Sequence, residues 1–429
     1  MRFRLNAVYG GIHATYWMVY GVVSSFASAF LLGRGYNNAR IGMILAAANI
    51  VSVAIQPFLA DFADRSKKIS LIGVTELANA LVGVLLLGCL FSPRACFALS
   101  VVYVLMLAWH TALHPLFNSL AFRLSESGYA INFGVTRAMG SLFYAILCAF
   151  LGVLTERYST EILPVVGEIT VVLLAAVLLL VNCTYKKACR LRDARSAAQA
   201  DMSGAAEGSQ QAEERLSEDK TGVDAAGAGE AEAEITLFDF IRRNKLFFIV
   251  NLGILGVYFS NSITNSFMLQ IVENVGGTSE DMGKIFSFMA FLEIPGLFLF
   301  DRIHKHFSNK VLLQFAAASF FAKIFVIFLA KSVFLVYVAQ LLQLTSFALF
   351  LPAIVSFTNE IMEKGEAVKG QALYTIVTTV ASVAASLLGG FILDYRGASA
   401  LLFVTVAITG LGMVFFVFTM EKLAKSRAQ

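Results

Sequence analysis

The chain has 429 residues, of which 58% are hydrophobic and only 14% are charged, with a mean hydropathy of +0.74. A soluble domain is about a quarter charged, so this composition excludes an ordinary soluble protein and indicates lipid as the solvent. The formal net charge of +4 is modest, and we expect no nucleic-acid partner.

Twelve apolar stretches follow one another along the chain, and each is long enough for the roughly 20 residues that a membrane-spanning helix needs. They lie at about 7–32, 38–60, 69–91, 96–122, 131–154, 162–184, 246–271, 282–300, 311–330, 333–357, 370–393 and 399–419. We therefore predict an all-α membrane protein of about 12 transmembrane helices. The start of the chain shows no small-residue cleavage site, so the first span is expected to be retained.

One long connection divides these spans into six and six. Its centre, from Asp201 to Glu234, is rich in Ala, Gly, Ser and Glu and nearly lacks large apolar side chains. Such a segment buries too little apolar surface to fold, so we predict disorder there. The predicted organisation is an N-terminal six-helix bundle at 1–184, a cytoplasmic linker at 185–240 and a C-terminal six-helix bundle at 241–429.

The lysines and arginines predict the orientation. With the N-terminus inside, the two tails and the inner loops hold 24 of the 33, the outer loops hold seven, and two lie within spans. Basic residues favour the cytoplasmic side, so both termini and the linker are predicted to be cytoplasmic. The expected location is the bacterial inner membrane.

Arg137 is one of these two basic residues inside a span. A charge near the bilayer centre costs roughly 3 kcal/mol or more, so it usually has a partner and a function. Tyr144 follows two helical turns later on the same face. A guanidinium beside an aromatic ring suits a polar ligand with a flat side. The alternative is an arginine that extends to the cytoplasmic surface.

Glu293 and Lys323 are lone charges of opposite sign in the eighth and ninth spans. Because a buried charge needs a partner, we predict that they neutralise each other, and that the protonation of Glu293 couples transport to protons. Glu76 in the third span is the alternative coupling residue, unless it pairs with an adjacent loop.

Neutral polar side chains mark three further spans. His110, His114 and Asn118 share one face of the fourth span; the histidine pair lacks a third metal ligand nearby, so a ligand contact or a polar seam is favoured over a metal site. The other polar positions are Ser260, Asn261, Ser262, Thr264, Asn265 and Ser266 in the seventh span, and Gln340 and Gln343 in the tenth. Amides favour a neutral, hydroxyl-rich ligand, although they also join helices.

Two loops in matching places of the two halves carry an acidic residue before a basic cluster. The first contains Asp64-Arg65-Ser66-Lys67-Lys68, and the second begins Asp301-Arg302. The first loop is similar to the helix 2–3 motif of the major facilitator superfamily, GxxxD(R/K)xGRR, with Ala60 and Lys67 in place of its glycines. The resemblance covers nearly the whole chain except the linker. It implies two six-helix pseudo-repeats, and a cytoplasmic gate role for Asp64, Arg65 and Lys68.

Within the superfamily, the chain resembles the lactose permease group and the oligosaccharide and nucleoside proton symporters. The resemblance rests on a segment of the fifth span with Phe133-Gly134, Arg137, Gly140 and Tyr144, which matches the sugar-binding stretch of the permease's fifth helix. The resemblance also implies a binding role for Glu293 and a pairing role for Lys323. Where the chain departs from the permease pattern, the replacing side chains are neutral. The glutamate that partners the binding arginine is replaced by Asn118 or Ser119, and a histidine and a glutamate of the tenth helix are replaced by Gln343 and Ser346. Two buried ion pairs are replaced by Ser262 with Ser382 and by Asn265 with Gln340.

The predicted function is secondary transport of a small polar solute, a sugar or nucleoside, by proton-coupled symport and alternating access. The predicted substrate-binding residues are Arg137, Tyr144, Asn118, His114, Asn261, Asn265, Glu293 and Gln343; the coupling residues are Glu293, Lys323 and Glu76. The alternatives are a uniporter or drug exporter of the same fold, and a transporter-like sensor that signals through the linker. No HExxH, GxSxG or Walker motif is present, so neither an enzyme nor a cofactor is predicted, and we expect a monomer in the bilayer.

Overall fold

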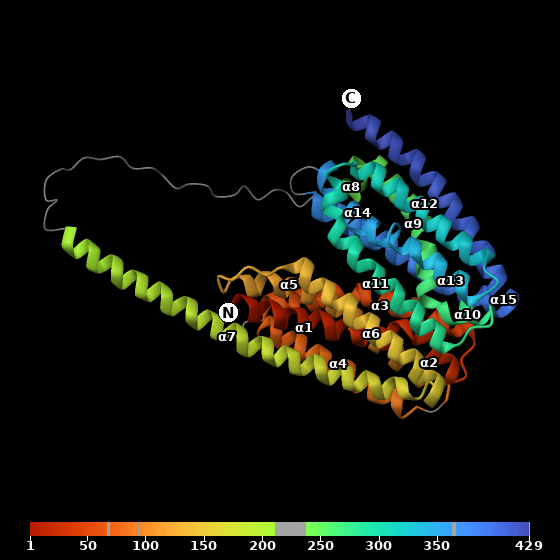
Figure 1. The fold of residues 1–429 in the computed structure, drawn as a ribbon, viewed down its shortest axis with the longest axis horizontal. Coiled ribbons are helices and arrows are strands. Elements are labelled where there is room, and N and C mark those ends of the chain that lie inside the picture. The colour runs from red at the N-terminus through yellow and green to blue at the C-terminus, as the bar shows by residue number, and fades with distance from the viewer. Residues whose placement is uncertain (67–68, 93, 211–236, 363–365, 429) are drawn as a thin grey trace.

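The computed structural model describes residues 1–66, 69–92, 94–210, 237–362 and 366–428. All secondary structure in these ranges is helical (Figure 1). The first half of the chain contains α1 (Arg2–Tyr20), a π-helical turn (Gly21–Ser25), α2 (Ala27–Gly33), α3 (Asn38–Arg65), α4 (Leu71–Leu90), α5 (Phe97–Ser125), α6 (Phe133–Tyr158) and α7 (Ile162–Gln210).

The second half contains α8 (Leu237–Arg243), α9 (Lys245–Ser266), α10 (Met268–Glu273), α11 (Ser279–His304), α12 (Asn309–Leu329), α13 (Val333–Gln340), a 3-10 turn (Leu341–Gln343), α14 (Phe347–Ile361) and α15 (Ala367–Ala428). The α15 segment turns at Gly397, where φ is 78°. Only glycine adopts this left-handed conformation at little cost. Gly397 therefore divides α15 into two helices.

Among the described residues, nine helices are long and apolar enough to cross a membrane, or up to eleven if each of two bent pairs is one span. One of the nine, Ala367–Leu423, has 57 residues, which is more than twice the roughly 20 that a span needs. The turn at Gly397 makes this stretch two passages, which agrees with the predicted number of about twelve. The all-helical membrane fold is therefore confirmed.

The helices begin where short polar side chains accept a hydrogen bond from the first turn. Asn37, Ser70, Asn132 and Ser308 each cap a helix in this way. Such caps satisfy backbone N–H groups that have no partner inside the helix. The predicted disorder does not begin at Asp201: α7 continues beyond residue 184 to Gln210, because its extension consists largely of Ala, Arg, Lys and Gln, which favour helix. Residues 211–236 lie outside the described part of the chain.

Corresponding helices of the two halves are broken at a buried phenylalanine. The first break is at Phe26, between the π-helical turn and α2, where the chain bends by 45°. The second is at Phe267, between α9 and α10. Both rings are fully buried. Because broken helices at matching places are typical of transporters built from two repeats, these breaks support the internal repeat.

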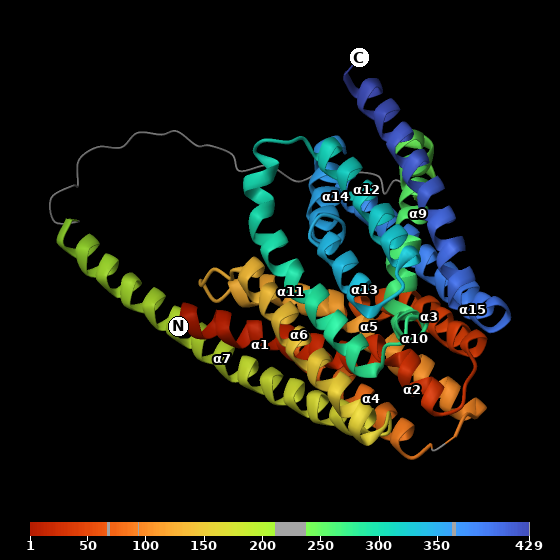
Figure 2. The same cartoon turned by 45° about the vertical axis from the view of Figure 1, so that its right-hand side comes forward.

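The two bundles meet at one end and diverge at the other. Figure 2 shows them splayed on the side where both chain termini lie, which is the predicted cytoplasmic side. At the opposite end Gly152 of α6 packs on Gly283 of α11, with no room for a side chain between them. There the N–H groups of Asn38 and Ala39 of α3 also donate to the carboxylate of Asp394, at 3.0 and 2.8 Å. The two halves are therefore in close contact at the predicted periplasmic end and diverge at the other.

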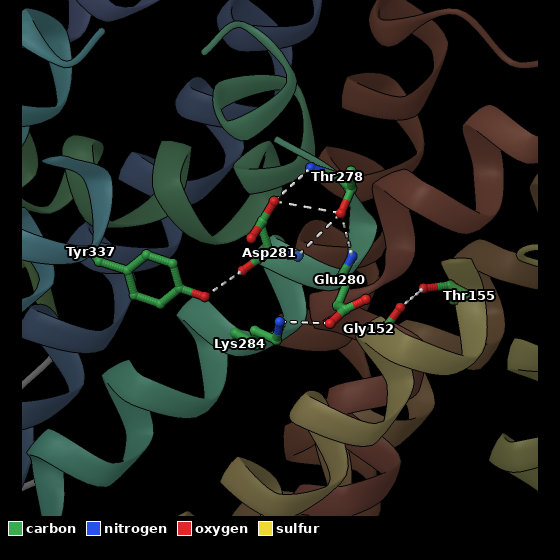
Figure 3. Close-up of polar contacts among 7 residues, drawn as sticks. All are labelled: Gly152, Thr155, Thr278, Glu280, Asp281, Lys284 and Tyr337. Atoms are coloured by element: carbon green, nitrogen blue, oxygen red, sulfur yellow. Dashed lines mark hydrogen bonds and ion pairs between the residues drawn. The ribbon is translucent and has the colours of Figure 1, made fainter. Parts of the chain in front are cut away.

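Local hydrogen bonds stabilise the closed end around the start of α11 (Figure 3). The Thr278 hydroxyl accepts from the backbone of Glu280 and Asp281, and the Asp281 carboxylate accepts from the Thr278 N–H at 3.1 Å. This reciprocal cap fixes the first turn of α11. Lys284 pairs with Glu280 at 2.6 Å. The backbone that faces Gly152 is thereby held in place.

Candidate functional site

A central cavity of about 190 Å³ lies between the two halves. Its walls come from α1 and α6 of the first half, and from α9, α11 and the segment around the 3-10 turn of the second. The lining residues are Trp17, Tyr20, Arg137, Ser141, Tyr144, Tyr258, Asn261, Asn265, Phe286, Met289, Ala290, Glu293, Gln343 and Phe347. Six of the eight predicted substrate-binding residues line this cavity, and they come from three separate helices and the 3-10 turn.

Arg137 supplies the positive charge of the cavity from α6. Its guanidinium carbon lies 4.3 Å from the centre of the Trp17 ring, a cation–π contact. One guanidinium nitrogen donates to the Ser141 hydroxyl at 3.3 Å. The guanidinium plane of Arg137 is thus held against the Trp17 ring, and its remaining N–H groups stay available for a ligand. The alternative of an arginine that extends to the surface does not agree with this position.

Glu293 supplies the negative charge from α11, on the other half. Its carboxylate accepts a hydrogen bond at 3.0 Å from the amide nitrogen of Gln343. The amide oxygen of Gln343 in turn accepts at 2.6 Å from the ammonium group of Lys323. Among the described side chains no ion pair within 4.0 Å joins Glu293 to Lys323. The predicted direct pair is therefore replaced by a chain of two charge-assisted hydrogen bonds through Gln343.

Tyr144 lies two turns along α6 from Arg137, on the same wall of the cavity. Its hydroxyl shares a 2.7 Å hydrogen bond with Ser25, in the π-helical turn of the first transmembrane helix. Asn261 and Asn265 of α9 complete the polar lining. Single π-helical turns often mark functional sites, and this one adjoins the cavity.

Other predicted site residues lie behind or away from this cavity. The ring of His114 stacks on Tyr16 at 5.5 Å and meets the edge of Trp17 at 5.7 Å, so it supports Trp17 from behind. Asn118 and Glu76 are half-buried, and neither lines the cavity. Each of these two has one side-chain oxygen that is buried without a hydrogen-bond partner. The described residues contain no group of three potential metal ligands.

The predicted gate motif stays a prediction. Arg65 pairs with Asp61 of its own helix at 2.6 Å, and both side chains are exposed. Asp64 lies in the last turn of α3, its side chain lies outside the described part of the chain, and so does Lys68.

Sequence reasoning missed the aromatic part of the lining. Trp17, Tyr20, Tyr258 and Phe286 surround the charged pair. The cluster Tyr16-Trp17 with Tyr20 was visible in the first span, and Trp17 is one of two tryptophans in the chain. Its position gave no sign of whether the ring faces lipid or protein, because aromatic side chains suit both.

Comparison with known proteins supports one family. The sequence profile of the MFS_1 like family matches residues 9–405. The maltose permease of Geobacillus stearothermophilus is 24% identical over 414 residues, which are 95% of this chain and 93% of that protein. The uncharacterized transporter YwbF of Bacillus subtilis strain 168 is 22% identical over 395 residues, covering 90% and 86%.

Among solved structures, the nucleoside transporter NupG superimposes with a TM-score of 0.72 at 13% identity, covering 98% of this chain and 99% of that one. This likeness shows the fold, and the profile shows the family. The prediction of a transporter rather than an enzyme is thereby confirmed. The chain belongs to the MFS_1 like family and is a multi-pass membrane transporter of the major facilitator superfamily.

Proposed function

We propose that the protein is a proton-coupled symporter of a small neutral polar solute, a sugar or a nucleoside, in the bacterial inner membrane. The observation that carries the proposal is the central cavity, where Arg137 and Glu293 come from opposite halves between aromatic side chains. A sugar ring or a nucleoside offers hydroxyl groups at its rim and a flat face for stacking. The likeness to a maltose permease and to a nucleoside transporter agrees with this class.

Alternating access would move the two halves about this cavity. The described state is closed at the end where Gly152 meets Gly283, so it corresponds to release toward the cytoplasm. A ligand that contacts Arg137 on one half and Glu293 on the other would bind best at one separation of the two halves. Its binding would therefore depend on the conformation of the protein. Such differential binding is what lets a ligand shift a conformational equilibrium.

Glu293 is the residue proposed to bind the transported proton. It is the carboxylate of the central cavity, and its hydrogen bond to Gln343 connects it to the buried Lys323. When protonated it would lose the negative charge that Gln343 and Lys323 stabilise, and this chain would weaken. Glu76 lies outside the cavity, which makes it the second choice.

Replacing Glu293 by glutamine is expected to stop accumulation against a gradient, because the amide cannot exchange a proton. Equilibrium exchange of labelled solute across the membrane should continue at a reduced rate. The measurement is uptake into proteoliposomes with and without an inward proton gradient. Glu156→Gln, at an exposed position in the last turn of α6 that does not line the cavity, is the matched control. Unchanged accumulation by Glu293→Gln would transfer the coupling role to Glu76.

The test of the proposed function is a panel of radiolabelled monosaccharides, disaccharides and nucleosides in the same proteoliposomes. Accumulation that requires the proton gradient would establish symport and identify the solute class. Equilibration without accumulation would indicate the uniporter alternative. Efflux of apolar dyes with no uptake of the panel would favour an exporter.

The sensor alternative has its own test. Deleting residues 200–232 is expected to leave transport within about twofold of wild type, because the residues that line the cavity all lie in the two bundles. Uptake by the deletion variant is compared with that of a variant in which the same residues are replaced by a Gly-Ser linker of equal length. Loss of uptake by both the deletion variant and the Gly-Ser variant, each correctly inserted, would favour the sensor.

A further inference from the structure

A second cavity adjoins the central one. It has a volume of about 150 Å³ and lies between the first transmembrane helix, α3, α5, α9 and α15. The two cavities share the side chains Tyr20, Tyr258, Asn261 and Asn265. They are therefore neighbouring chambers on either side of Tyr20 and Tyr258, which come from the first helix of each half. The charged chamber faces α6 and α11, and the second chamber faces α3, α5 and α15.

The second chamber differs from the first in its charge. None of its lining residues is ionisable at neutral pH, whereas the first contains Arg137 and Glu293. Its polar groups are hydroxyls and amides, among them Asn49, Thr111 and Ser382. A charged ligand group would be desolvated there without a counter-charge, at a large cost. The second chamber therefore suits a neutral group.

Hydrogen bonding within the wall leaves acceptors toward the second chamber. The amide nitrogen of Asn49 donates to the backbone oxygen of Leu45 at 2.9 Å, and the Thr111 hydroxyl donates to that of Leu107 at 2.8 Å. The amide nitrogen of Asn265 likewise donates within its own helix at 2.9 Å. The oxygen atoms of these side chains keep free lone pairs. Ligand hydroxyl groups, which can donate, are the matching chemistry.

The two chambers together have the size of one ligand site. Small-molecule pockets usually exceed about 300 Å³, and neither chamber reaches that value alone, while the two together do. We propose that the second chamber is a ligand subsite that binds a neutral, hydroxyl-bearing ring, while the charged chamber binds a second ring of the same molecule against Trp17. The ligand is then two rings joined by a glycosidic bond, as in a disaccharide or a nucleoside. This proposal rests on the proposed function.

The test compares a two-ring ligand with its one-ring part on the purified full-length protein. Equilibrium binding is measured for maltose and glucose, and separately for adenosine and adenine. The first comparison tests a disaccharide as the ligand, and the second tests a nucleoside. Asn49→Leu and Thr111→Val each remove an acceptor from the second chamber, and the latter nearly preserves side-chain volume. We expect each variant to weaken the two-ring ligand by about fivefold, the effect of one lost hydrogen bond, and the one-ring ligand by less than about twofold.

Two matched controls lie on the same helices but line neither chamber. Gln56→Leu lies two turns beyond Asn49 on α3, and Ser125→Ala removes a hydroxyl of α5 that donates to its own backbone at 2.8 Å. Both should leave all affinities unchanged. The subsite would be overturned if Asn49→Leu and Thr111→Val weakened the two-ring and the one-ring ligand equally, or weakened neither. The proposed function would survive that result if Arg137→Lys still prevented binding. A wild-type protein that binds neither pair would overturn the proposed function and the subsite with it.

Discussion

Replacing Arg137 by lysine is expected to weaken ligand binding by about 100-fold and to reduce transport below detection. Lysine keeps the charge but loses the planar fork that can donate two hydrogen bonds to one ligand group. It also loses the stacking on Trp17 at 4.3 Å that holds the group in place. A charged hydrogen bond contributes about 1.5–3 kcal/mol, and each 1.4 kcal/mol is a factor of ten. The measurement is equilibrium binding of the transported solute to purified protein.

Arg157→Lys is the matched control for this substitution. Arg157 lies near the other end of α6 and is exposed, and it lines neither chamber. Its replacement should leave affinity unchanged. Near-normal affinity of Arg137→Lys would show that the guanidinium does not contact the ligand. In that case Arg137 would act only through its contact with Trp17, and Trp17→Leu would then produce the larger loss.

Replacing Gly283 by valine is expected to stop transport while ligand binding persists. A Cβ atom at Gly283 would lie 2.5 Å from the backbone oxygen of Cys148 and 2.6 Å from the Cα of Gly152. Neither neighbour is the end of a flexible side chain, so α6 and α11 would have to move apart. The closed periplasmic end would then be disfavoured, and the carrier would remain open to that side. Single-turnover release into proteoliposomes should fall below detection.

The control for the gate is a glycine of α6, the helix that Gly283 contacts, at a position that faces no backbone. A Cβ atom at Gly134 would approach only the side chain of Asn132, at 3.8 Å. Gly134→Val should therefore transport normally. A cysteine in place of Glu293 reports whether the central cavity is open to the outside. In the Gly283→Val background this cysteine should react with a membrane-impermeant thiol reagent added from outside. Wild-type transport by Gly283→Val would contradict the assignment of this contact as the closed gate.

Gly42 and Gly390 make a corresponding contact between α3 and α15. Each lies directly against the backbone of the other helix, with no space for a side chain. The closed end thus depends on two glycine contacts, one on each side of the interface between the halves. The hydrogen bonds from Asn38 and Ala39 to Asp394 add a polar link beside the second contact. Because close backbone approach requires small residues, these positions restrict where the halves can meet.

The sequence alone determined the class of the protein, and it predicted several residues that line the central cavity. The low charge and the twelve apolar stretches require a membrane, because the solvent sets which residues can be exposed. Arg137, Glu293 and Lys323 were found because a charge within a span is costly enough to need a reason. The same argument selected Glu76, which is half-buried and does not line the cavity, so its coupling role stays a prediction.

Only the tertiary structure decided which side chains meet. In a membrane both the lipid-facing and the protein-facing sides of a helix are apolar, so periodicity does not indicate which side is inside. The sequence could therefore neither place Gln343 between Glu293 and Lys323 nor choose Trp17 as the ring that stacks on Arg137. The second chamber combines helices from both halves. Contacts between residues so distant in the chain depend on how the helices pack, and the local sequence carries little record of that packing.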